Sequence, residues 1–163
     1  MRKSGWAGFL GAMALVTTAW AQQDDPSDAP DPELEPSEVV QIQLEALQHN
    51  DDPVPDAGIS TVFAFASPSN RTQMGPLRRF ADMIHNGFGE MINHREAHLL
   101  PLAMREGTAL QPVELVGRDG TVYRYVFVLT RQTDPPYRGC WMTDSVIGDP
   151  QGSAAAAQQD RSI

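Results

Sequence analysis

The 163-residue sequence predicts an α+β domain, because helical patterns come first along the chain and strand patterns follow them. An α/β protein would alternate the two patterns along its length. No internal repeat of useful period is present, and 41% of the residues are apolar, which is enough for the core of one domain. We therefore expect N-terminal helices packed on an antiparallel sheet.

The first 21 residues have the form of a signal peptide. Arg2 and Lys3 precede an apolar run at residues 6–16, and Ala19-Trp20-Ala21 is an A-x-A cleavage site. The run is too short to span a bilayer as a stable helix, although a retained membrane anchor is the alternative. We expect cleavage after Ala21, a periplasmic or secreted location, and no membrane insertion after cleavage.

Charge and proline content separate the remaining chain into three parts. Residues 22–36 hold six acids and four prolines, which predicts a disordered leader, either a plain spacer or a tail that binds calcium or a partner. Residues 37–148 form the predicted domain, and the apolar-poor residues 149–163 a disordered tail. Without the signal peptide, ten arginines and 21 acids give a net charge of −11, which disfavours nucleic acid as a partner.

Three helices are predicted. The first begins with Ser37 as its N-cap and ends before the sequence DDPVPDAG. The second is capped by Asp56 and stopped by Ser67-Pro68, although its VFAFA segment could also be a strand. The third follows Gly75-Pro76. Helical spacing predicts these buried positions: Val40, Leu44, Leu47; Ile59, Val62, Phe63, Ala66; Leu77, Phe80, Ala81, Ile84, Phe88.

Four β-prone runs follow: MINHREAHLLPLAM, LQPVELVG, TVYRYVFVLTR and YRGCWMTDSVI. Arg118-Asp119-Gly120 predicts a tight hairpin between the second and third. In the third run, both faces are largely apolar. One face carries Tyr123, Tyr125, Phe127 and Leu129, and the other carries Val122, Val126 and Val128 with Arg124.

A second apolar face on one strand needs a cover other than water. The helices can cover only one face, so we expect a homodimer through the other. In such a dimer, Arg124 could pair with an acid such as Glu114 of the partner subunit. The alternative cover is the segment after Ile147, which has little apolar bulk.

The segment FAFASPSNR, followed by GPLRRFADMI and later by Gly139-Cys140, resembles a family of secreted bacterial domains of unknown function with the hallmark F-A-F-A-S-P-x-x-R. The resemblance covers residues 39–147. It implies the cystatin-like cone of the nuclear transport factor and ketosteroid isomerase superfamily, in which helices pack into a strongly curved antiparallel sheet. The chain departs from the family by the insertion DDPVPDAG and by Tyr137, where a Trp is expected. The family has no assigned activity, so only architecture is implied.

A cone of this kind could hold a small apolar or anionic ligand. Arg71 is the candidate for an anionic group, with capping of a helix C-terminus or pairing with a carboxylate as the alternatives. The other candidates for ligand binding are aromatic residues: Phe63, Phe80, Tyr123, Tyr125, Phe127 and Trp141. We expect no cofactor.

Catalytic and metal-binding patterns are sparse. Asp82 and His85 are spaced i, i+3 on the third predicted helix and could form an acid/base pair, and Glu90 is a further candidate base. His94, Glu96 and His98 lie two residues apart, so on one strand they would face the same way and could hold a metal ion. The single cysteine, Cys140, is expected to be buried as a small apolar residue.

Three functions therefore stay open. The favoured one is a non-catalytic module that binds a ligand or serves as an accessory domain. The alternatives are a small enzyme using acid/base chemistry in the cone, and a structural dimer whose cone is filled by its own side chains.

Overall fold

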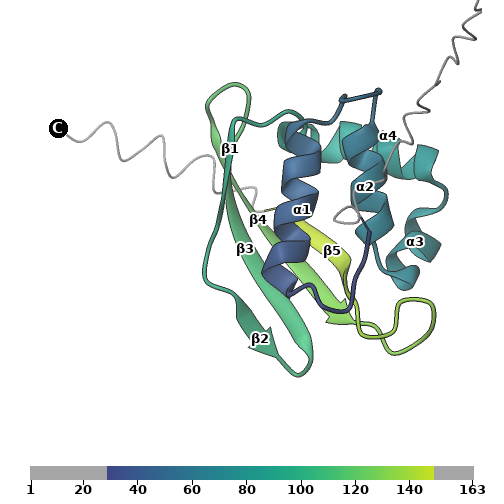
Figure 1. The fold of residues 1–163 in the computed structure, drawn as a ribbon. Coiled ribbons are helices and arrows are strands. Elements are labelled where there is room, and N and C mark those ends of the chain that lie inside the picture. The colour runs from purple at the N-terminus through teal and green to yellow at the C-terminus, as the bar shows by residue number, and fades with distance from the viewer. Residues whose placement is uncertain (1–28, 149–163) are drawn as a thin grey trace, which may run out of the picture.

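The computed structural model describes residues 29–148, so the predicted signal peptide, residues 22–28 of the acidic leader and the C-terminal tail lie outside the described part. Figure 1 shows the elements in chain order. The helices are α1 (Pro36–Gln48), α2 (Ala57–Phe65), α3 (Pro68–Met74), α4 (Leu77–Gly87) and the short 3₁₀ helix η2 (Gly89–Met91). The strands are β1 (Glu96–Leu99), β2 (Ala103–Arg105), β3 (Thr108–Val116), β4 (Val122–Arg131) and β5 (Trp141–Gly148).

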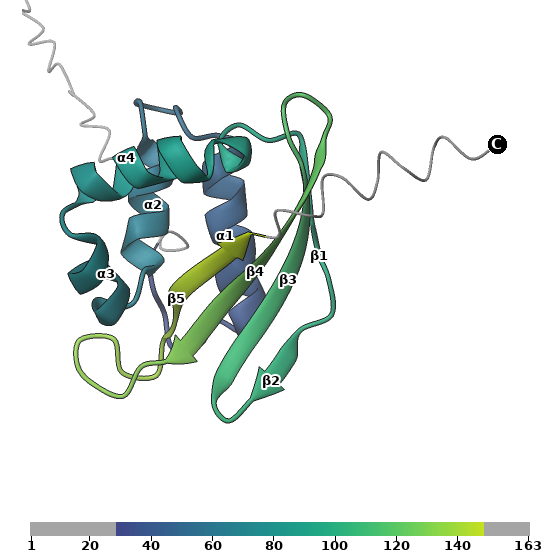
Figure 2. The ribbon, with the colours of Figure 1, turned by 180° about the vertical axis from the view of Figure 1, so that it is seen from behind.

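The strands form one antiparallel sheet in the order β1-β3-β4-β5, and β2 pairs with the beginning of β3. Four helices lie on one face of this sheet, and the view from behind shows the other face without a helix (Figures 1 and 2). The sheet is not closed into a barrel. The predicted α+β class, with N-terminal helices packed on an antiparallel sheet, is confirmed.

Helix α1 has the predicted buried face but begins earlier than predicted. Its first residue is Pro36, and Glu35 is the N-cap in a capping box with Glu38. The predicted cap, Ser37, instead donates a hydrogen bond from its hydroxyl to Gln111 Oε1 on β3 at 2.7 Å. Ser37 thus fixes the helix to the sheet.

Residues 62–65 of the segment VFAFA are part of helix α2, so the helical interpretation is confirmed for them. The last residue, Ala66, is the C-cap and forms a single β-bridge with Thr143. A separate helix, α3, which is not among the three predicted helices, begins at Pro68. Ser67 caps α3 by accepting a hydrogen bond from the Asn70 backbone at 3.1 Å, and Pro68 is its first residue.

Helices α1 and α2 approach each other at Gly58. The Gly58 amide donates to the Asn50 carbonyl at 3.0 Å. A β-carbon at position 58 would lie 2.1 Å from the Ala46 carbonyl oxygen. The two backbones are therefore in direct contact, which only glycine permits.

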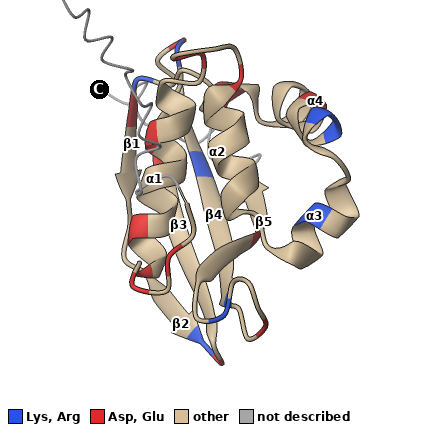
Figure 3. Ribbon diagram, turned by 45° about the vertical axis from the view of Figure 1, so that its right-hand side comes forward, with Lys and Arg blue, Asp and Glu red and all other residues tan. Residues whose placement is uncertain are grey.

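Strand β4 has the two predicted faces. Tyr125, Phe127 and Leu129 are buried beneath the helices, whereas Val126 on the opposite face is half-buried. Arg124 also lies on that face, and its guanidinium contacts Glu114 of the neighbouring β3 at 2.7 Å. Figure 3 shows the basic and acidic positions on the ribbon, including a basic segment within β4. Arg124 therefore has an acid partner within its own chain, and the predicted contact with an acid of a second subunit stays a prediction.

Candidate functional site

An apolar cavity of about 110 Å³ lies between the helices and the sheet. Its lining comes from all four α-helices, from η2, and from β4 and β5. The apolar lining residues are Leu47, Val62, Ala66, Met74, Phe80, Met83, Ile84, Phe88, Met91, Phe127 and Val146. Three of these are methionines, whose flexible side chains adapt their shape to different occupants.

The buried polar residues of the lining, Gln43, Asn70 and Thr143, are held in a short chain of hydrogen bonds. Gln43 Nε2 donates to Thr143 Oγ1 at 2.9 Å and to the Val39 carbonyl at 3.0 Å. Asn70 Nδ2 donates to the Thr143 carbonyl at 3.2 Å. Asn70 Oδ1 has no partner, the only such buried side-chain nitrogen or oxygen found within residues 29–148. The cavity wall thus includes a residue with an unsatisfied acceptor, which is costly to bury without a ligand or water.

The partly exposed lining residues show where the cavity opens. Met74 and Met83 are half-buried on α3 and α4, and Asp144 and Val146 are half-buried on β5. Gln43, Leu47 and Phe127, on the other side, are buried. The cavity therefore opens between the α3–α4 pair and strand β5.

Some of the predicted ligand-binding residues line the cavity, and the others lie elsewhere in the structure. Phe80 and Phe127 line the cavity. Phe63 packs on Phe80, with ring centroids 5.2 Å apart, from outside the lining. Trp141 is buried at the start of β5.

The two predicted tyrosines, Tyr123 and Tyr125, are not part of the cavity lining. The Tyr123 hydroxyl donates to Asp119 in the hairpin at 3.3 Å. Tyr125 packs its ring against Phe88, with centroids 6.1 Å apart, and burial, followed by the charge of Glu90, raises its pKa to about 12.

Arg71 caps a helix and is not part of the cavity lining. Its Nε donates to the Ala66 carbonyl at 2.9 Å and a terminal nitrogen donates to the Ala64 carbonyl, so it satisfies the C-terminal end of α2. The guanidinium also lies over the rings of Phe63 and Tyr137, at 5.4 and 5.1 Å. Of the three roles open from the sequence, the contacts support the capping role.

The candidate catalytic residues do not form the predicted pair. His85 Nε2 contacts Asp56 Oδ1 at 2.9 Å, at the beginning of α2, rather than Asp82. Asp82 and Glu90 are both exposed. Glu90 borders a surface groove with Tyr123 and the hairpin at Asp119, away from the apolar cavity.

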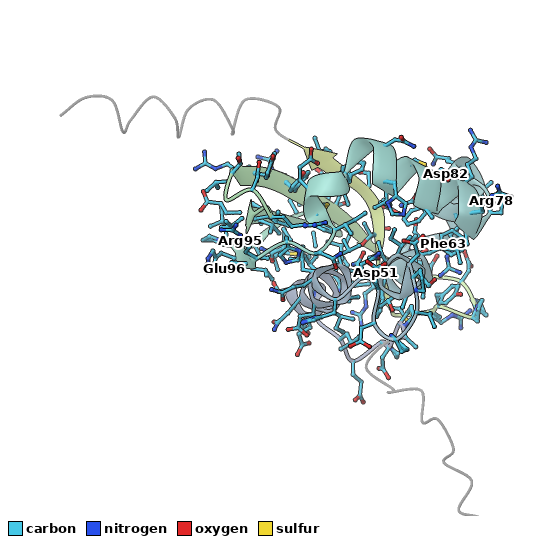
Figure 4. All side chains as sticks on the ribbon, turned by 90° about the horizontal axis from the view of Figure 1, so that it is seen from above. Asp51, Phe63, Arg78, Asp82, Arg95 and Glu96 are labelled. Atoms are coloured by element: carbon cyan, nitrogen blue, oxygen red, sulfur yellow. The ribbon has the colours of Figure 1, made fainter. Side chains whose placement is uncertain are left out.

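The candidate metal ligands are also separated. Strand β1 begins only at Glu96, and the chain turns at Asn93 with a φ of 52°, so His94 does not share the strand alternation. His94 is buried, whereas Glu96 and His98 are exposed and contact each other at 3.4 Å. Glu96 lies on the side of the molecule opposite Asp82 (Figure 4). No group of three or more His, Cys, Asp or Glu side chains in residues 29–148 could hold a metal ion, so the predicted set is corrected.

The surroundings of His94 predict a pH dependence of stability. Burial lowers its pKa below the ordinary value of 6.5, and its Nδ1 donates to the Met91 carbonyl at 2.8 Å. Because the unfolded chain takes up this proton first as the pH falls through 6.5, the free energy of unfolding should decrease below that pH. Urea unfolding at pH 7.5 and 5.0 should show a smaller decrease in His94→Gln than in the parent. His98 is exposed, so His98→Gln serves as the control. An equal decrease in the free energy of unfolding between pH 7.5 and 5.0 in all three proteins would contradict the prediction.

Cys140 is buried, as predicted, and burial raises the pKa of its thiol. A thiol in this state is a poor nucleophile.

The fold and the cavity define a small α+β domain with an apolar pocket between its helices and its sheet. The profile of the family described as Domain of unknown function (DUF4864) matches residues 31–151, which is most of the chain, and the protein belongs to this family. A comparison with curated proteins found no match. No helix within the described residues has the length and apolar character needed to cross a bilayer.

Proposed function

We propose that this protein is a non-catalytic binding module that takes a small apolar group into the cavity between its helices and β5. The observation that carries the proposal is the cavity itself: about 110 Å³ of space with an apolar lining and an unsatisfied acceptor on one wall residue, Asn70. Apolar cavities of a comparable size, on the order of 150 Å³, stay dry and bind benzene in other proteins. A ligand with a hydrogen-bond donor would also satisfy Asn70 Oδ1.

The positions of the charged residues favour binding over acid/base catalysis. The buried polar side of the cavity consists of the amides of Gln43 and Asn70 and the hydroxyl of Thr143, none of which titrates near neutral pH. The candidate acids and bases Asp82, His85 and Glu90 are exposed and absent from the lining. The acid that does belong to the lining, Asp144, is half-buried at the opening on β5, away from the buried polar side. Phe80 and Phe127 border the space without filling it, which disfavours the interpretation as a filled cone.

A titration with benzene tests the proposal. In ¹H–¹⁵N NMR spectra, benzene should shift the amide signals of cavity residues such as Ile84, Phe127 and Thr143 in a saturable manner. Val146→Phe should abolish these shifts, because Val146 shares the helix-facing side of the sheet with Phe127 and a phenyl group would fill the opening. Val146→Thr, of nearly equal volume, is the matched control. Unsaturable shifts, or shifts that persist in Val146→Phe, would remove the cavity as the binding site.

Three further proposals rest on the sequence as much as on the fold. The N-terminal segment supports export, with cleavage after Ala21, as the route to a periplasmic or secreted location. Helices packed on one face of an antiparallel sheet support a relationship to the cone superfamily of nuclear transport factor.

The third proposal is a homodimer through the helix-free face of the sheet. That face has a groove of about 370 Å³ bordered by Leu100, Pro112, Val126 and Ile147. Ile147 is 58% exposed, and Leu100 and the nearby Leu102 are 36% and 37% exposed. An apolar surface of this kind marks an interaction site more often than a free surface.

Light scattering of Val126→Glu and the parent decides whether this dimer forms. The parent should be dimeric at micromolar concentration, and the mutant monomeric, because the carboxylate would be buried at the interface without a partner. Val126→Thr keeps the size of the side chain and should remain dimeric. A monomeric parent, or a dimeric Val126→Glu, would refute the proposal.

A further inference from the structure

The two edges of the sheet differ in how well they are protected. At one edge, β1 and β2 are only four and three residues long, and Pro101 interrupts the chain between them. Their side chains include Glu96, His98 and Arg105. Short strands, charged side chains and proline are the features by which sheet edges avoid unwanted pairing.

The opposite edge, β5, has eight residues, one charged side chain and no proline. The outer edge of its first half is covered by the segment after α2. Thr143 forms a β-bridge with Ala66, and the Thr143 carbonyl accepts a hydrogen bond from the Ser67 amide at 2.9 Å. Beyond Thr143, the structure gives residues 144–148 hydrogen-bond partners only on β4 within the part of the chain that it describes. About every second backbone N–H and C=O of this stretch therefore points outward without a partner.

This open stretch of backbone also forms one wall of the apolar cavity. The open edge and the cavity wall share three residues, Asp144, Ser145 and Val146. Met74 and Met83 form the facing wall at the opening. The cavity is smaller than the roughly 300 to 1,000 Å³ typical of sites for drug-sized molecules. Its size suits a single apolar side chain, and the methionines allow side chains of different shape.

We propose that the occupant is an extended peptide segment of a partner protein, added as a strand along residues 144–148 of β5. Main-chain hydrogen bonds to the open edge supply binding that is independent of sequence, and one large apolar side chain in the cavity supplies selectivity. The inference rests on the proposed binding function and names the chemical class of its ligand. A free small molecule would leave the β5 edge unused.

Selection from a phage-displayed library of random decapeptides on the purified full chain tests the inference. Enriched peptides should share one large apolar residue, and they should lose at least tenfold in affinity for Val146→Phe while keeping their affinity for Val146→Thr. Bound peptide should protect alternate amides of residues 144–148 from hydrogen exchange. N-methylation of alternate peptide amides on the edge that faces β5 should weaken binding at least tenfold, whereas methylation on the other edge should not.

The outcomes separate this inference from the proposed function. If no peptide is enriched, or if N-methylation on either edge has the same effect, the peptide inference fails, while benzene binding still supports the cavity as a site. If benzene also fails to bind, both fail together. Enrichment on a chain ending at Gly148, but not on the full chain, would identify residues 149–163 as the occupant and overturn the partner proposal.

Discussion

Replacing Gly58 with alanine should lower the free energy of unfolding by roughly 3 kcal/mol, the upper end of the usual cost of overpacking. The added methyl group would lie 2.1 Å from the Ala46 carbonyl oxygen and 2.9 Å from the Asn50 α-carbon. Both of these atoms belong to the backbone, so no side-chain rotation relieves the clash. Helices α1 and α2 would have to separate, and their shared buried residues, including Leu47 and Ile59, would lose contact.

Urea unfolding monitored by circular dichroism measures this effect. Gly87→Ala is the matched control, because a β-carbon on Gly87 would have no atom within 4 Å. Alanine within a helix is favoured over glycine by about 1 kcal/mol, so this control should be neutral or slightly stabilising. If Gly58→Ala lowered the free energy of unfolding by less than about 1 kcal/mol, the two helices would not be in close contact at this position.

Phe80→Ala should lower the free energy of unfolding by about 3 to 5 kcal/mol, the usual cost of removing a buried aromatic side chain. Phe80 is 4% exposed and packs against the ring of Phe63. Because Phe80 also lines the cavity, the truncation would enlarge an existing space rather than create a new one.

Leu77→Ala provides the comparison on the same helix. Leu77 is 39% exposed, so its truncation should cost below about 1 kcal/mol in the same urea unfolding experiment. Similar losses for the two variants would mean that Phe80 is not a core residue.

Much of the architecture was predictable because periodicity follows directly from burial. Val40, Leu44 and Leu47 recur at helical spacing and are all buried on α1. The alternation in β4 placed Tyr125 and Phe127 on one face and Val126 on the other, as the structure has them. Each of these patterns arises because a single helix or strand packs one side against the core.

Boundaries were less predictable, because the same residues can end one helix and begin another. Ser67-Pro68 was interpreted as the stop of α2, yet a serine followed by a proline is also a strong helix start, and it begins α3. Helix α4 carries the predicted buried residues Phe80 and Ile84, but Leu77 of the same predicted stripe is the first residue of the helix and is exposed.

The candidate site was not predictable, because it depends on contacts between distant segments. Its lining combines residues from α1, such as Leu47, with residues from β5, such as Val146, and no local pattern connects the two. His94, Glu96 and His98 illustrate the opposite error: their spacing is regular, but the turn at Asn93 removes His94 from the strand. Three roles for Arg71 were open from the sequence, and only its contacts with Ala64 and Ala66 show that it caps α2.

The hydrogen bond between Gln43 and Thr143 constrains the order in which the protein can fold. It joins the first helix to the last strand, across one hundred positions of the chain, and both side chains are buried. Until β5 has been synthesised, Gln43 lacks this partner, and α1 has no complete surface to pack against. The native core can therefore close only after β5 has been synthesised, and folding should be slower than in helical domains of similar size, whose contacts are local.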